Sequence, residues 1–341
     1  MILRICWLFL LAVQLAARAE QKLNIFIYSE YLPAAVVAEF EKRFDCKVVI
    51  DFYEDSEAML AKIQTGGASL YDIVVPTDYI ITAMVHQKLL APLRLANIPN
   101  LKNLEPTFKS PPYDPGNKYS VAYQWGTLGI MARKSGTPLK NSWSVIFEPK
   151  DQAGPFLLLD SPRDTIGAAL KYKGWSMNSI RPEPLKTARD LIIGAKNRSL
   201  GFSNTVGGKN KVLDKSARLA VVFSGEAARG MAEDPDTYFF IPREGSEIWV
   251  DNLSILANAA HRDLAEKFIN FVLEPEIGAK ISNEYQFATP NAAAKKFVDS
   301  KLLSNPVIYP DAQTMKNLEF IRDLGGDSVL YDQLWTSIKS Q

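Results

Sequence analysis

The chain has 341 residues, enough for two domains at roughly 150 residues each. Its composition of 47% hydrophobic, 11% aromatic and 23% charged residues is that of a globular protein and excludes a long disordered or collagen-like chain. The 39 basic residues nearly balance the 38 acidic ones, and only two His and two Cys are present. The sequence therefore disfavours a nucleic-acid partner and a Cys/His metal site.

The first nineteen residues are predicted to be a signal peptide. Arg4 supplies a positive charge, residues 5–13 form an apolar run, and Ala17-Arg18-Ala19 has the small-x-small pattern that precedes a cleavage site. The run is too short to span a bilayer core of about 30 Å. We therefore expect a secreted, soluble mature chain that begins at Glu20 and carries a net charge of about −1.

Strands and helices alternate along the first part of the mature chain. Strands are expected over residues 23–28, 48–52 and 73–76, and helices are expected behind Pro33 and over residues 56–64. Such alternation predicts an α/β fold with a largely parallel sheet. In such a fold, ligands bind beyond the C-terminal ends of the strands.

A second set of elements follows a long connection. Residues 97–118 are rich in Pro and Asn, which predicts an irregular surface segment, and a second domain is expected to begin around Gly129. The further elements expected are strands over residues 119–123 and 156–160 and helices over residues 165–172, 264–273 and 313–323. The alternating pattern thus restarts in the second half of the chain.

Aromatic residues lie next to carboxylates at the predicted strand ends. The pairings are Tyr28 and Tyr31 with Glu30, Tyr79 with Asp78, Phe223 with Glu226, and Trp249 with Asp251. Aromatic faces attract ammonium groups by about 0.5–2 kcal/mol, and carboxylates offset the lost hydration of a buried cation. No GxGxxG or GxxxxGK[ST] loop is nearby, so the pattern fits a small organic cation better than a nucleotide.

Catalysis has little support in the sequence. No GxSxG motif is present, and neither His86 nor His261 lies near a Ser or Cys nucleophile in the chain. Two carboxylates could still act as the acid and base of a secreted glycoside hydrolase, because the sequence does not give their separation. A binding protein without a cofactor is the favoured interpretation, and the hydrolase is an alternative.

Five sequence blocks, spread over nearly the whole mature chain, form a specific pattern. They are Tyr28-Ser29-Glu30-Tyr31-Leu32-Pro33, Tyr71-Asp72-Ile73-Val74-Val75-Pro76-Thr77, Glu244-Gly245-Ser246-Glu247-Ile248-Trp249-Val250-Asp251, Ala288-Thr289-Pro290-Asn291-Ala292-Ala293-Ala294 and Tyr309-Pro310-Asp311-Ala312. In these blocks the chain resembles the periplasmic polyamine-binding proteins, the substrate-binding subunits of ABC importers for putrescine and spermidine. The resemblance implies a periplasmic monomer that passes its ligand to a permease in the inner membrane.

The resemblance also implies a two-lobe periplasmic binding protein fold of type II. Each lobe is expected to be a mixed, mostly parallel sheet flanked by helices, and a hinge between the lobes allows closure over the ligand. Lobe 1 is expected to comprise residues 20–128 and 250–295, and lobe 2 residues 129–249 and 296–341.

Site residues follow from the same resemblance. Those expected to line the cleft are Ser29, Tyr31, Thr77 and Tyr79 from the first lobe and Asp164, Trp249 and Asp251 from the second lobe and hinge. Glu30 and Glu226 stand where putrescine-preferring members have acidic residues.

Five positions depart from the family pattern. Tyr28 and Phe223 stand in place of Trp, and Phe287 stands in place of Tyr, which implies weaker cation–π faces and one hydroxyl fewer. Ser161 replaces an Asp, and Ile321 replaces a Gln, that spermidine-preferring members carry. Both changes remove partners for a third amine, so a short diamine such as putrescine is expected rather than spermidine. Alternatives are a guanidinium or quaternary ammonium ligand, or a sensor that docks on a receptor.

Overall fold

The computed structural model describes residues 21–53 and 56–341, so the predicted signal peptide and its cleavage site lie outside the described residues. The strands are β1 (Gln21–Tyr28), β2 (Cys46–Tyr53), β3 (Ile73–Val74), β4 (Ser120–Arg133), β5 (Phe156–Leu159), β6 (Phe202–Ser203), β7 (Leu219–Phe223), β8 (Thr237–Phe240) and β9 (Ile248–Ile255). The helices are α1 (Ala34–Phe44), α2 (Ser56–Gln64), α3 (Asp78–His86), α4 (Ser144–Phe147), α5 (Pro162–Tyr172), α6 (Pro182–Lys196), α7 (Thr205–Leu213), α8 (Ser224–Glu233), α9 (Arg262–Val272), α10 (Pro275–Tyr285), α11 (Ser300–Leu303), α12 (Ala312–Met315) and α13 (Ser328–Ser340). In the part of the chain that the structure describes, no helix is long and apolar enough to span a membrane.

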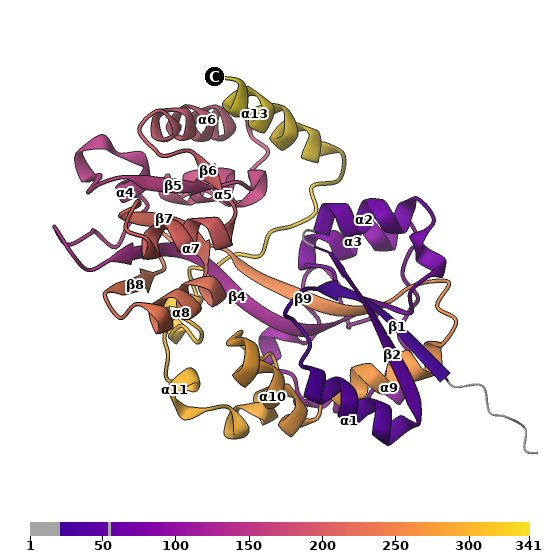
Figure 1. The fold of residues 1–341 in the computed structure, drawn as a ribbon. Coiled ribbons are helices and arrows are strands. Elements are labelled where there is room, and N and C mark those ends of the chain that lie inside the picture. The colour runs from indigo at the N-terminus through magenta and orange to yellow at the C-terminus, as the bar shows by residue number, and fades with distance from the viewer. Residues whose placement is uncertain (1–20, 54–55) are drawn as a thin grey trace, which may run out of the picture.

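The strands are divided between two lobes that share two long strands (Figure 1). In lobe 1, β1 pairs in parallel with β2 and β3, and in lobe 2, β5 pairs in parallel with β6 and β7. The long strands β4 and β9 run antiparallel to each other, and β9 also pairs with β3 while β4 pairs with β7 and β8. The predicted two-lobe α/β fold is confirmed, with β4 and β9 as the connection between the lobes.

Local sequence signals account for the helices of lobe 1. Pro33 stands immediately before α1, which buries Val36 and Phe40 and packs against α9, with the rings of Phe40 and Phe268 5.0 Å apart. The helices predicted over residues 56–64 and 264–273 are confirmed as α2 and α9. Helical periodicity and Pro at the start of a helix therefore predicted these elements correctly.

One predicted helix is wrong. Only residues 313–315, which belong to α12, are helical in the segment 313–323, and the chain further on is extended beside the start of β9. There the backbone N–H of Glu319 donates to the carbonyl of Ser246 at 2.9 Å, and the N–H of Ile248 donates to the carbonyl of Glu319 at 3.1 Å. Pairing with β9, together with the burial of Ile321, overrides the helical spacing of the apolar residues.

The connection over residues 97–118 is irregular, as predicted, and contains short 3-10 turns that bury Leu104 and Phe108. Among the described residues, two hydrophobic clusters fill lobe 1 and one fills lobe 2, and a further cluster packs the segment after α10 against α8 and β7. This last cluster joins the C-terminal part of the chain to both long strands. The segment boundaries expected for the two lobes, 20–128 with 250–295 and 129–249 with 296–341, remain predictions.

Candidate functional site

Five aromatic rings from both lobes and the connecting strands contact one another in a row. Along this aromatic row, the ring centroids of Tyr28 and Tyr31 are 5.4 Å apart, and those of Tyr31 and Phe287 are 5.3 Å apart. The row continues with 5.7 Å from Phe287 to Trp249 and 5.9 Å from Trp249 to Phe223, all in edge-to-face geometry. These residues come from β1, the turn after it, the segment behind α10, β9 and the end of β7. Folding thus brings together five of the six aromatic residues predicted to line the site, and Tyr79 is the sixth.

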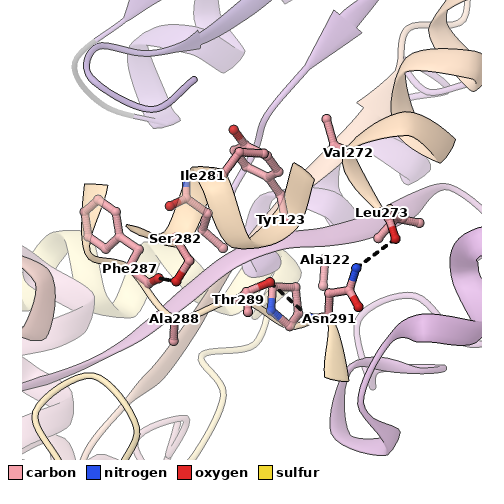
Figure 2. Close-up of a pocket in the computed structure, with 13 residues that line it drawn as sticks. Ala122, Tyr123, Val272, Leu273, Ile281, Ser282, Phe287, Ala288, Thr289 and Asn291 are labelled. Atoms are coloured by element: carbon pink, nitrogen blue, oxygen red, sulfur yellow. Dashed lines mark hydrogen bonds between the residues drawn. The ribbon is translucent and has the colours of Figure 1, made fainter. Parts of the chain in front are cut away.

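The C-terminal end of α10 positions Phe287. Gln286 has a left-handed backbone, with φ of 58°, and ends the helix, and the hydroxyl of Ser282 donates to the carbonyl of Phe287 at 2.6 Å (Figure 2). The cavity beside these residues has a volume of about 10 Å³, space for roughly one water molecule. It is therefore a packing defect beside the row and not the ligand site.

Asp251 lies beside the aromatic row, where it contacts Tyr31. Its carboxylate accepts a hydrogen bond from the hydroxyl of Tyr31, and the residue pairs with Thr77 through an isolated backbone bridge. Only 6% of Asp251 is exposed. Burial raises the pKa of Asp251 to about 7, although hydrogen bonds from Tyr31 and Thr77 act in the opposite direction.

Three further buried carboxyl groups are linked to Asp251 by electrostatic interactions, because the charges of Asp251 and Asp164 act on Asp78, and those of Asp164 and Asp78 act on Glu247. We call Asp78, Asp164, Glu247 and Asp251 the acidic cluster. Asp78, Asp164 and Glu247 are buried, and each has one carboxyl oxygen with no hydrogen-bond partner within the described chain. Burial raises the pKa of Asp78 well above its usual value, and the charges of Asp251 and Asp164 raise it further. The carboxyl groups of the acidic cluster therefore repel one another electrostatically when they are ionised.

Glu247 is coupled most directly to Asp164. Burial, followed by the negative charge of Asp164, raises the pKa of Glu247 well above its usual value. Asp164 also accepts a hydrogen bond from the hydroxyl of Ser161, which stands immediately before α5. Among the residues that the structure describes, no member of the acidic cluster forms an ion pair with Lys or Arg.

Four other predicted site residues belong neither to the aromatic row nor to the acidic cluster. Ser29 and Glu30 are exposed in the turn after β1, where Glu30 has a left-handed φ of 53°. Tyr79 is partly buried beside the core of lobe 1, and its backbone N–H donates to Asp78 at 2.8 Å. Glu226 is buried, but its carboxylate is paired with Arg229. Glu226, which the sequence analysis assigned to a ligand amine, is thus already paired with the guanidinium group of Arg229.

Two acidic residues were missing from the predicted site set. The sequence analysis gives Asp78 only as a neighbour of Tyr79, and Glu247 only as a member of a sequence block. A signal for Glu247 was present, because positions 247, 249 and 251 alternate along an extended segment and therefore point to the same side as Trp249 and Asp251. Within residues 21–53 and 56–341, no group of three or more His, Cys, Asp or Glu residues is arranged to hold a metal ion.

A row of aromatic rings beside buried carboxyl groups, built between two α/β lobes, defines a solute-binding protein. The model of the bacterial extracellular solute-binding protein family matches residues 35–309, and the chain belongs to this family. It is 30% identical over 331 residues to the spermidine/putrescine-binding periplasmic protein of Escherichia coli strain K12, covering 95% of this chain and 94% of that protein. It is 31% identical over 345 residues to the putrescine/cadaverine-binding protein of Pseudomonas aeruginosa strain PAO1, covering 97% of each.

The structural comparison agrees. The substrate-binding protein PotD of a spermidine/putrescine ABC transporter from Streptococcus pneumoniae superposes with a TM-score of 0.86 and 29% identity, over 94% of this chain and 99% of that one. The resemblance to polyamine-binding proteins seen in the sequence is confirmed, and the chain is a binding protein and not an enzyme. The alternative of a carboxylate-pair hydrolase is wrong.

Proposed function

We propose that this protein is the periplasmic substrate-binding component of an ABC importer. It captures a short diamine such as putrescine in preference to spermidine and delivers the diamine to a membrane permease. The acidic cluster carries the proposal, because Asp251 is hydrogen-bonded to Tyr31 of the aromatic row and none of the four buried carboxyl groups forms an ion pair with Lys or Arg in the described chain. A buried carboxylate without a counter-charge costs several kcal/mol, and a bound ammonium group offsets that cost.

Several features favour two positive charges on the ligand. The cluster spans the lobes, with Asp78 at the start of α3 in lobe 1 and Asp164 in the first turn of α5 in lobe 2. A single guanidinium or quaternary ammonium group would leave part of this negative charge unmatched. The relatives named for putrescine, cadaverine and spermidine support a polyamine. Ser161 and the buried Ile321 offer no charge to a third amine.

Calorimetric titration of the mature chain, from Glu20 onward, tests this proposal. The ligands are putrescine, cadaverine, spermidine, agmatine and choline at neutral pH. We expect putrescine to bind with a micromolar or lower Kd and spermidine to bind more weakly. Heat signals for choline or agmatine alone would favour the monocation alternative, and the lack of any signal from the polyamines would refute the proposal.

Ser161→Asp is expected to shift selectivity toward spermidine. The hydroxyl of Ser161 now donates to Asp164, and a carboxylate in its place adds a negative charge next to that residue. A third ammonium group would gain a partner, so the ratio of spermidine to putrescine affinity should rise by about tenfold. Titration of both ligands measures this ratio, with Ser161→Asn as the uncharged control. An unchanged ratio would show that position 161 does not select ligand length.

A further inference from the structure

One positively charged side chain of the protein lies against Phe287, the middle ring of the aromatic row. Arg229 lies in α8, three residues after Glu226, and its guanidinium group donates a hydrogen bond to the Glu226 carboxylate. The guanidinium carbon is 5.4 Å from the centroid of the Phe287 ring. The exposed fractions of the two side chains are 28% for Arg229 and 10% for Glu226, so the pair is largely shielded from water.

The first turns of α8 lie directly against Phe287. A Cβ atom added at Gly225 would be 2.1 Å from the Phe287 ring, a distance that no real side chain tolerates. Gly225 and Arg229 are four residues apart and therefore lie on the same face of the helix. Because Gly225 has no side chain, the Phe287 ring fits against α8, and Arg229 lies over the same ring one helical turn later. Arg229 thus contacts an aromatic ring and a carboxylate, the two kinds of group that recognise a ligand ammonium.

The charges beside Phe287 and Glu226 disfavour another amine. The carboxylate of Glu226 is matched by Arg229, and the face of Phe287 is approached by the same guanidinium. An incoming ammonium group would meet a positive charge and find no free acid there. No member of the acidic cluster forms an ion pair with Lys or Arg in the described part of the chain, although the charge of Arg163 also acts on Glu247. The two regions therefore differ in whether an acid is already paired with a cation of the protein.

We infer that Arg229 is a specificity-determining residue, an internal cation that closes the Glu226 end of the site to a third ammonium group and so favours a diamine over a triamine. This inference rests on the proposed function, because it presumes that polyamines bind along the row. It adds a repulsive element against the longer ligand, which selective sites need besides attractive contacts. A purely structural ion pair on α8 would instead affect stability and leave selectivity unchanged.

The test is the ratio of spermidine to putrescine affinity in Arg229→Gln, measured by calorimetric titration. We expect this ratio to rise by about tenfold or more, because Glu226 and the Phe287 face become available to a third ammonium group. Arg229→Lys keeps the positive charge and should keep the selectivity of the unmodified protein. Arg43→Gln is the matched control, since Arg43 also pairs with a carboxylate, Glu274, and stacks on a ring, Phe271, at 4.8 Å in lobe 1.

A second variant shows whether Glu226 causes the expected gain in spermidine affinity. Combining Glu226→Gln with Arg229→Gln removes the acid together with the guanidinium, so the gain in spermidine affinity should disappear. Thermal unfolding establishes that each variant is folded, and Arg229→Met replaces Arg229→Gln if the polar variant does not fold. Putrescine binding with an unchanged ratio in Arg229→Gln would overturn this inference and leave the proposed function standing. Failure of the unmodified protein to bind any polyamine would overturn both.

Discussion

Replacing Asp251 by Asn is expected to weaken putrescine binding by about 2–5 kcal/mol, a loss of about 30-fold to about 4,000-fold. Asp251 is buried, lies beside the aromatic row and has no Lys or Arg partner among the described residues, so an ammonium group placed there loses its counter-charge in the variant. The amide oxygen of Asn can still accept the hydrogen bond from Tyr31, which keeps the geometry of the site. Calorimetric titration with putrescine measures the effect.

Two comparisons separate lost charge from lost structure. Asp160→Asn removes the same charge near Ser161 from an exposed position, where Asp160 pairs with Lys339, and should change affinity little. Asp251→Asn should also raise the unfolding temperature of the ligand-free protein at pH 8, because it removes an ionised carboxylate that is buried without compensation. A loss of affinity below tenfold would contradict the assignment of Asp251 to the ligand.

Putrescine binding is also expected to weaken about tenfold for each unit of pH below 7. The pKa of Asp251 is about 7 in the ligand-free protein because the group is buried. Below that pH the carboxyl group is protonated, and an ammonium ligand must displace the proton before it can pair with the carboxylate. Binding should therefore release protons, and the affinity should level off above pH 7.

Titrations between pH 5 and pH 8, in buffers with different enthalpies of ionisation, measure both affinity and proton release. Asp251→Asn should flatten the pH dependence that this group contributes. The unliganded protein gives a second readout with a defined sign. Because the folded pKa of Asp251 lies above its unfolded value, the contribution of this group to stability is present at low pH and is lost as pH rises toward 7. An affinity that stays constant from pH 8 to pH 5 would contradict the role given to Asp251.

Alternation and local signals predicted most of the fold. Pro33 before α1 and the apolar spacing within α2 and α9 are local features, and each indicated its helix correctly. The segment 313–323 has the same helical spacing, yet hydrogen bonds to the first residues of β9 hold Glu319 in an extended conformation. A sequence pattern records which residues are apolar but not which distant strand competes for their backbone groups.

The sequence by itself determined the solute-binding family and the aromatic side chains of the row, because these depend on residue types at strand ends and on five long sequence blocks. Only the tertiary structure decided which carboxyl groups form the acidic cluster. Asp78 and Asp164 come from α3 and α5, Glu247 immediately precedes β9, and their burial together depends on how two lobes pack. The pairing of Glu226 with Arg229 is local to α8, but only packing places this pair against Phe287. The charge available to a ligand is a sum over contacts made in space, and position along the chain does not record that sum.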